Sequence, residues 1–184
     1  MDGADGVTGS LALIAMLGIN IFEIFSSNYN FNFLMIAFTG SLIPYLYFNL
    51  NKSDKNKIFL GDSGSLFLGF SIAFLLLYES QFEKKFSSPF ALWIVAIPVF
   101  DTISVIVYRI KNSLPLFNPD RNHLHHFLQN LIYSKFKVLL VIIGLGFLFL
   151  FLGLLIEYIY QLLSLPLFVI FLLIYIWIRV FYKN

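Results

Sequence analysis

Six apolar stretches, separated by short polar connectors, constrain this chain more than any other feature of its sequence. A helix needs about 20 mostly apolar residues to cross the roughly 30 Å hydrocarbon core of a bilayer. Of the 184 residues, 59% are hydrophobic and 12% are charged, whereas a soluble domain has about 25% charged residues. We therefore expect an all-α, polytopic membrane protein. The predicted spans are residues 9–26, 31–50, 65–79, 90–109, 137–157 and 163–182.

The third predicted span is the shortest, because only residues 66–78 are continuously apolar or small. It reaches a sufficient length if residues 58–60 lie at the membrane surface just before it. The connectors contain no repeat or low-complexity tract, so residues 1–184 are expected to form a single integral-membrane domain.

The basic residues predict how the chain is oriented. With the N-terminus in the cytoplasm, ten Lys and Arg residues lie on the inner side and two, Lys84 and Lys85, lie on the outer side. This bias follows the positive-inside rule. A net charge of +2 does not indicate a nucleic-acid partner, and the absence of cysteine excludes disulfides, zinc–thiolate sites and iron–sulfur clusters.

Short polar motifs interrupt the apolar sequence, and the predicted spans place all of them on the cytoplasmic side. The first contains Asp2 and Asp5, which would share one face of a helix but which, with their neighbouring glycines, equally suit a tight turn. Two acids at this surface suit a metal ion or a basic substrate group. Clustered charges next to a bilayer are costly, and this favours a functional interpretation.

The second motif opens the third span. Its residues are Gly61, Asp62, Ser63, Gly64 and Ser65. Ser63 or Ser65 is expected to cap the helix, and the glycines allow backbone N–H groups to approach a phosphate. Asp62 is a hard oxygen ligand of the kind that Mg²⁺ takes together with substrate phosphates. A plain N-cap and turn explains the same five residues equally well.

The third motif contains all three histidines of the chain: Asp120, Arg121, Asn122, His123, Leu124, His125 and His126. Asn118 and Pro119 predict a helix start. Apolar residues at helical spacing then predict an amphipathic helix over 118–131 at the membrane surface. On this helix His123 and His126 would face the polar side and His125 a flank. Imidazoles donate hydrogen bonds to phosphate, transfer protons or bind a transition metal, whereas the alternative is a solvated loop.

Asp101 lies inside the fourth predicted span. An acidic residue there is expected to face a cavity or a partner helix. A role in the site and a structural hydrogen bond are equally compatible with its position. Pro98 is expected to open the helix one turn earlier.

These motifs resemble those of the polyprenyl-phosphate N-acetylhexosamine-1-phosphate transferases, of the glycosyltransferase family 4 type. That family carries Asp-Gly-x-Asp-Gly, Gly-Asp-x-Gly-Ser, Pro-x-x-Asp-Thr and Asp-Arg-x-His-x-His-His. Here they correspond to residues 2–6, 61–65, 98–102 and 120–126. The order and spacing agree over essentially the whole chain.

The resemblance implies a multi-pass protein of the bacterial inner membrane that starts cell-surface glycans, including lipopolysaccharide. A UDP-N-acetylhexosamine, in this branch UDP-GlcNAc, donates its sugar-1-phosphate to undecaprenyl phosphate and UMP is released. Mg²⁺ is the implied cofactor, with Mn²⁺ as a substitute, and Asp62 is its implied ligand. The implied catalytic residues are Asp2, Asp5, Asp62, His123, His125 and His126. The implied substrate-binding residues are Gly61, Ser63, Gly64, Ser65, Asp101, Asp120, Arg121 and Asn122.

Family members begin with further helices that carry an Asp-Asp pair, whereas this chain starts at Met1 inside the first motif. The sequence thus resembles an N-terminally truncated member. The alternatives are an inactive fragment, or one that depends on a separate N-terminal half or on a homodimer. A membrane transporter that uses Asp101 and the histidines is a third alternative. It is disfavoured because no pair of broken spans occurs in matching halves.

Overall fold

The computed structural model describes residues 6–25, 33–51, 54–115 and 123–181, and every regular element within them is helical. The long helices are α1 (Val7–Phe25), α2 (Phe33–Asn49), α3 (Gly61–Leu77), α5 (Ala96–Lys111), α7 (Lys135–Ile159) and α8 (Ser164–Val180). The shorter elements are η1 (Asp54–Asn56), η2 (Tyr78–Phe82), α4 (Ser88–Ile94), α6 (Leu124–Leu131) and η3 (Gln161–Leu163). The prediction of an all-α membrane protein is confirmed.

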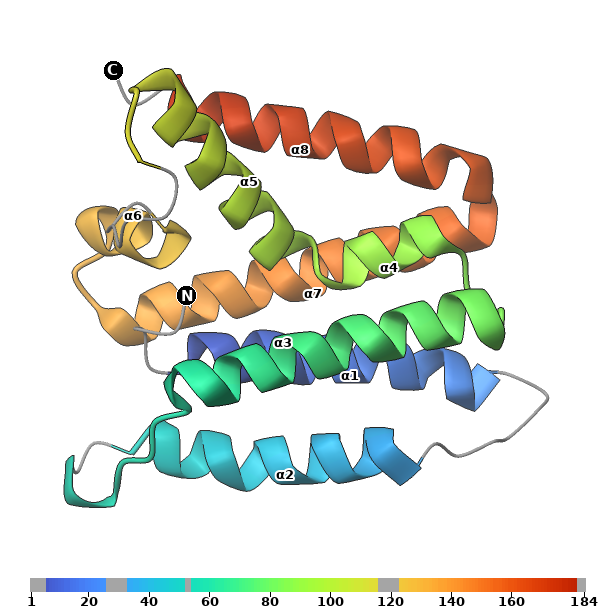
Figure 1. Cartoon of the computed structure of the whole chain (residues 1–184), viewed down its shortest axis with the longest axis horizontal. Coiled ribbons are helices and arrows are strands. Elements are labelled where there is room, and N and C mark those ends of the chain that lie inside the picture. The colour runs from blue at the N-terminus through green and yellow to red at the C-terminus, as the bar shows by residue number, and fades with distance from the viewer. Residues whose placement is uncertain (1–5, 26–32, 52–53, 116–122, 182–184) are drawn as a thin grey trace.

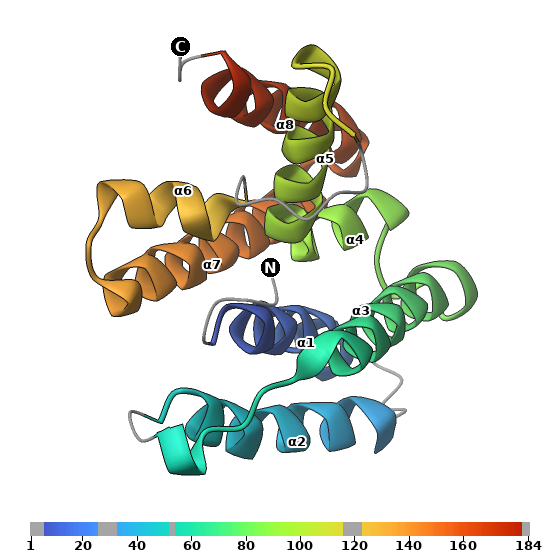
Figure 2. The same cartoon turned by 60° about the vertical axis from the view of Figure 1, so that its left-hand side comes forward.

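The helices form a layered bundle in which α7 and α4 lie between two groups (Figure 1). On one side, α1 contacts α2, α3 and α7. On the other side, α8 packs against α4 and α5. Helix α6 lies beside the first part of α7, as the turned view also shows (Figure 2). The starts of α3 and α7 and helix α6 therefore share one end of the bundle, which we call the motif end.

Three of the described helices are long and apolar enough to cross a bilayer: Gly61–Phe82, Lys135–Ile159 and Gln161–Val180. The bent pair α4–α5 makes a fourth span if it is taken as one unit, and α1 and α2 are shorter apolar helices. Each of the long helices overlaps one of the predicted apolar stretches, because length and composition determine where an apolar helix forms.

The third span is longer than the predicted 65–79 at both of its ends. Helix α3 begins at Gly61 and continues through the π-helical turn η2 to Phe82, giving 22 residues. Residues 58–60 are not needed to complete it. Glu79 in this turn is fully buried, and its carboxylate lies 2.8 Å from the Lys85 ammonium. A buried charge is tolerated there because it has a partner of opposite charge.

The fourth predicted span is broken: α4 and α5 meet at an angle of 82°. The break lies at Val95, and Pro98 occupies the first turn of α5. The N–H groups of a first turn have no acceptor within the helix, so a proline there costs no hydrogen bond. The predicted opening before Pro98 is confirmed. The size of the bend was not predicted, because it depends on how α5 packs against α7 and α8.

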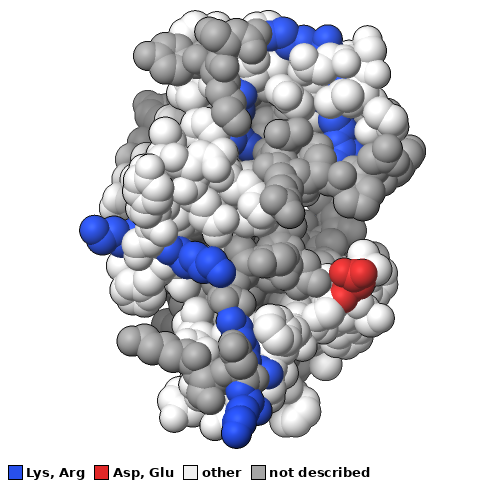
Figure 3. Space-filling model, turned by 90° about the vertical axis from the view of Figure 1, so that its left-hand side faces the viewer, with Lys and Arg blue, Asp and Glu red and all other residues white. Residues whose placement is uncertain are grey.

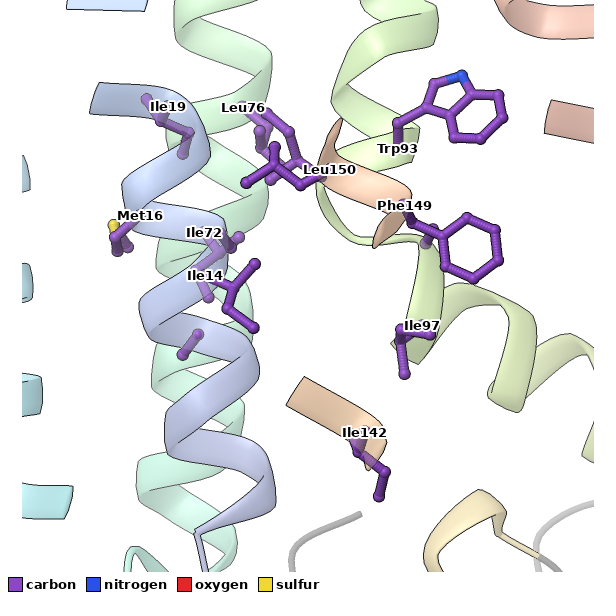
Figure 4. Packing of buried hydrophobic residues seen from close by; sticks show 14 of the residues in the cluster. Ile14, Met16, Ile19, Ile72, Leu76, Trp93, Ile97, Ile142, Phe149 and Leu150 are labelled. Carbon is purple, nitrogen blue, oxygen red and sulfur yellow. The ribbon is translucent and has the colours of Figure 1, made fainter. Parts of the chain in front are cut away.

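The core joins both groups of helices. Ile14, Met16 and Ile19 on α1 are buried; Ile14 packs against Gly146 of α7, whereas Met16 points to the opposite side of α1 (Figure 4). On the other side, Trp93 and Phe100 make edge-on or tilted contacts with Phe149 and Phe168. Such aromatic pairs contribute about 0.5–1.5 kcal/mol each beyond the area that they bury. They hold the bent pair rigidly between α7 and α8.

The end opposite the motifs is fixed by Glu157, near the end of α7. Its carboxylate accepts hydrogen bonds from the backbone N–H of Ser87, at 2.7 Å, and from the Ser87 hydroxyl, at 2.5 Å. Ser87 in turn caps α4, because its hydroxyl accepts the Phe90 N–H. Glu157 thus fixes where the chain enters the bent pair.

Candidate functional site

The motif end carries most of the described basic side chains. Lys135 and Lys137 at the start of α7 are exposed there. Figure 3 shows this end of the molecule with Lys and Arg at several places and an acidic patch at one edge. The surface is thus positively charged around the motifs, and such a surface attracts anionic ligands such as phosphates.

The second motif forms the first turn of α3. Gly61 has φ +68°, a conformation that glycine adopts without strain. Asp62 and Ser63 are exposed, and the Ser65 hydroxyl donates to the Asp62 carbonyl at 3.0 Å. The prediction that Ser63 or Ser65 caps the helix is wrong, because the N-cap is Leu60 and no side chain caps the helix. The first N–H groups of α3 therefore carry no side-chain cap, and helix starts of this kind bind anions.

Asn49 at the end of α2 connects the first and second motifs. It is buried, and its side-chain oxygen accepts the Gly6 N–H at 2.6 Å. Its amide nitrogen donates to the Ile58 carbonyl at 2.7 Å. Gly6 ends the first motif and Ile58 lies three residues before the second. One amide side chain thus holds the two segments together.

Asp101 on α5 binds the start of the histidine motif. The carboxylate is 1% exposed, and Oδ1 accepts the Leu124 N–H at 2.7 Å. Oδ2 lies 2.9 Å from His123 Nδ1. An acid from another helix therefore occupies the place of an N-cap for α6. Of the two roles that its sequence position allows, the structure confirms the contact with a partner helix, and a role in binding substrate stays a prediction.

Arg179 on α8 completes this arrangement. Its guanidinium nitrogen lies 3.6 Å from Asp101 Oδ1, and its side chain is 8% exposed. The guanidinium carbon also lies 4.6 Å from the centre of the Phe127 ring on α6, within the roughly 6 Å over which a cation and a ring attract each other. Arg179 therefore joins α8 to both α5 and α6.

Helix α6 is shorter than predicted. It begins at Leu124, and His123 precedes it in an extended conformation. A continuous helix over 118–131 is therefore wrong. On the part that is helical, Leu124 is buried and Leu128 packs against the core, whereas Leu131 is exposed. The acceptor that Asp101 provides for the Leu124 N–H is the physical reason why the helix starts there.

The three histidines have different surroundings. His123 and His126 are partly buried, whereas His125 is 3% exposed, so its predicted place on a flank of the polar side is wrong. The rings of His125 and His126 are 4.1 Å apart between centres, and those of His123 and His125 are 6.2 Å apart and parallel. Neither ring nitrogen of His125 has a hydrogen-bond partner among the described residues.

Burial, and to a smaller extent the neighbouring His126 and His123, lower the pKa of the His125 imidazole to about 4. His125 is therefore neutral at physiological pH. A neutral imidazole has one donor and one acceptor nitrogen, so it can hydrogen-bond a phosphate or sugar hydroxyl without adding a charge.

A cavity of about 440 Å³ connects the second and third motifs. Ser65 and His123 both line it, together with Thr102 on α5. The other walls are mostly apolar and come from α1, α3, α4, α5 and α7, down to Trp93. The cavity is therefore polar where the two motifs meet and apolar deeper in the bundle.

Some of the predicted site residues lie outside the described residues: Asp2, Asp5, Asp120, Arg121 and Asn122. Within the described ranges, no group of three or more acidic or histidine side chains is placed to bind a metal ion. Asp62 provides the one carboxylate of the second motif, and its side chain is exposed. One carboxylate suits Mg²⁺ when substrate phosphates provide further ligands.

Asn49 and Arg179 were missed as site residues by sequence reasoning. Each is a polar or charged residue at the end of an apolar span, and that alone was a signal. Arg179 is one of the ten basic residues whose distribution predicts the orientation. The partners of both residues lie far away along the chain.

Comparison with known proteins gives a consistent result. Residues 1–80 match the profile of Glycosyl transferase family 4. The chain is 30% identical over 160 residues to an undecaprenyl-phosphate alpha-N-acetylglucosaminyl 1-phosphate transferase of Escherichia coli, covering 86% of this chain and 44% of the relative. It is 35% identical over 152 residues to a probable undecaprenyl-phosphate N-acetylglucosaminyl 1-phosphate transferase of Bacillus subtilis, covering 81% and 41%.

The chain spans less than half the length of these relatives. No solved structure matches it significantly. The matches confirm the resemblance that the four motifs indicate. The chain is thus similar over most of its length to undecaprenyl-phosphate N-acetylglucosaminyl 1-phosphate transferases, and its residues 1–80 match glycosyl transferase family 4.

Proposed function

We propose that this chain forms part of a site that transfers N-acetylglucosamine-1-phosphate from UDP-N-acetylglucosamine to undecaprenyl phosphate. The observation that carries the proposal is the cavity between Ser65 and His123, polar at the motifs and apolar deeper in the bundle. A lipid phosphate has the same division: its head group is anionic and its chain is apolar. The part of the lipid next to the phosphate fits the apolar walls, and the phosphate then lies beside the motifs.

In the proposed reaction, an oxygen of the lipid phosphate attacks the sugar-bearing phosphorus of the nucleotide. A new P–O bond forms, the P–O bond to UMP breaks, and UMP leaves with the bonding electrons. Catalysis of phosphoryl transfer consists mainly of positioning and of stabilising negative charge. The uncapped N–H groups at the start of α3 and the neutral His125 are suited to hold phosphate oxygens without a covalent step.

Mg²⁺ is the metal that fits the proposal, and Asp62 would hold it. The ion, when bound, neutralises the charge of the diphosphate. Asp62 is exposed in the first turn of α3, next to the N–H groups that favour an anion, so a metal and a phosphate can be bound together there. Mn²⁺ takes similar oxygen ligands and is a second candidate.

We further propose that the motif end faces the cytoplasm, where UDP-sugars are the donors of glycan assembly. The described basic residues near this end include Lys57, Arg109, Lys111, Lys135 and Lys137, while Lys84 and Lys85 lie at the other end. This distribution supports the orientation that the positive-inside rule predicts.

The test is release of UMP by the full chain in proteoliposomes that contain undecaprenyl phosphate, with UDP-N-acetylglucosamine added. We expect release to require Mg²⁺ and to fall by at least 100-fold in Asp62→Asn, because one charge-neutralising interaction is lost. Glu83→Gln is the matched control, since it removes one exposed acid at the opposite end. Unchanged release in Asp62→Asn would refute the role of Asp62.

A second candidate is a fragment that binds the nucleotide sugar but needs another chain for turnover. The observation that favours it is the coverage, because the chain corresponds to 44% of the Escherichia coli relative. This candidate predicts binding of UDP-N-acetylglucosamine without UMP release, measured by calorimetry on the purified chain. Turnover by the purified chain alone would exclude it.

A further inference from the structure

The hydrogen bond between Asp101 and His123 determines more than the start of α6. The carboxylate contacts two groups at the start of α6: Oδ1 accepts the Leu124 N–H at 2.7 Å, and Oδ2 lies 2.9 Å from His123 Nδ1. The Arg179 guanidinium, 3.6 Å from Oδ1, adds a positive charge from α8. A backbone N–H donor and a cation thus lie beside a carboxylate that is 1% exposed. These surroundings suit its ionised form, which only accepts hydrogen bonds.

An ionised Asp101 carboxylate can only accept a hydrogen bond, and this determines the tautomer of the His123 imidazole. The proton of a neutral His123 must lie on Nδ1, and Nε2 on the far edge of the ring then has a free lone pair. His123 is a wall residue of the cavity, and its side chain is 30% exposed. The Nδ1 edge faces Asp101, so the Nε2 edge is the one available to a ligand in the cavity.

We propose that Asp101 is a positioning residue that holds His123 as the Nδ1–H tautomer and presents Nε2 to the acceptor phosphate as a hydrogen-bond acceptor. This rests on the proposed function. A phosphate monoester loses its second proton near neutral pH, with a pKa of about 6, so a monoanion in the cavity still carries a P–O–H group. Nε2 accepts that hydrogen bond and takes the proton as the freed oxygen forms the new P–O bond.

Arg179 has a separate part in this arrangement. It compensates the charge of Asp101 from α8, and its contact with Phe127 fixes the guanidinium over α6. Three helices therefore hold the imidazole in one orientation. Orienting a catalytic histidine through a buried carboxylate preserves both its tautomer and its direction.

The first test measures the tautomer and needs no activity. The full chain is labelled with ¹⁵N-histidine, reconstituted in proteoliposomes and studied by solid-state NMR near pH 7.5, and the His123 signals are identified by their loss in His123→Asn. We expect a protonated Nδ1 and a bare Nε2. In Asp101→Asn the new amide N–H₂ donates to Nδ1, so we expect the proton to move to Nε2.

The second test measures turnover in the same preparations. We expect Asp101→Asn to lower kcat by about 100-fold, the contribution of one proton transfer, with little change in the KM for the nucleotide sugar. Asp101→Glu should restore part of the rate, because it keeps a carboxylate. Ser104→Ala is the control, since the Ser104 hydroxyl bonds the backbone carbonyl of Asp101 and not its carboxylate.

The two tests separate the two proposals. A bare Nδ1 and a protonated Nε2 in the unmodified chain would overturn the role of Asp101, whatever the activity. The expected tautomer without turnover would refute the proposed function of the isolated chain and leave the positioning intact. If Asp101→Asn does not fold, the tautomer of the unmodified chain still decides.

Discussion

Asp62 on α3 and Asp101 on α5 are both acidic residues of the motifs, and their surroundings are opposite. Asp62 is exposed, and the hydrogen bond recorded in its turn goes to its backbone carbonyl. Asp101 is buried, and groups from α6 and α8 surround its carboxylate. An acid satisfied by the protein organises the fold around it, whereas an exposed one is available to a ligand. The difference indicates that Asp101 mainly stabilises the fold, whereas Asp62 is available to bind a ligand.

Stability measurements give the largest effect that separates the two acids. Asp101→Ala removes the acceptor of the Leu124 N–H and the carboxylate beside His123 and Arg179, so we expect a loss of about 3 kcal/mol in the free energy of unfolding. Asp62→Ala is the matched change and should alter it by at most about 0.5 kcal/mol. Denaturation of the detergent-solubilised chain, followed by circular dichroism, measures both. Equal losses would contradict the distinction.

His125 is a second buried group in the region around Asp101, and lowering the pH tests how its burial affects stability. Its pKa is lowered by burial to about 4 in the folded chain, against about 6.5 when unfolded. The unfolded state therefore binds the proton more readily, and stability is retained above pH 6.5 and falls toward pH 4. We expect a loss of roughly 2 kcal/mol between pH 7 and pH 4.5.

His125→Gln removes this titrating group and should flatten that part of the stability curve. His126→Gln is the control, because His126 is only partly buried. A curve that is equally steep in His125→Gln would show that another group titrates.

Asn49 provides a test in the region of Asp62, because it holds the segment that precedes the second motif. Asn49→Ala removes two hydrogen bonds at 2.6 and 2.7 Å and leaves Gly6 and Ile58 without this partner. We expect a loss of about 1.5 kcal/mol in the free energy of unfolding. Hydrogen exchange should increase at residues 57–60 and remain unchanged at α8. Asn112→Ala is the control, because its side chain bonds only the carbonyl one turn earlier.

Much of the fold could be predicted from the sequence, because apolar length determines where a membrane helix forms. The opening of the helix before Pro98 could also be predicted, because a proline lacks the backbone N–H that a continuous helix would use. The π-helical turn after Leu77 could not be predicted, since it depends on the partner that Lys85 provides for Glu79.

The site was predicted less completely. Asp62 and the histidines stood out as polar residues in short motifs, whereas the buried position of His125 depends on where α6 starts. That start depends on Asp101, 23 residues earlier. Asn49 bonds a residue 43 positions away. Contacts between residues so far apart in the chain cannot be predicted from the local sequence pattern or from composition.

The 82° break between α4 and α5 has a consequence for the lipids around the molecule. At 1.5 Å per residue the two helices, of 7 and 16 residues, would reach roughly 35 Å if straight, but bent they reach only roughly 27 Å from end to end. A hydrocarbon core of roughly 30 Å is thicker than that. If the pair crosses as one span, it is too short to match the bilayer, and we expect the hydrocarbon core beside its exposed parts to be thinner there.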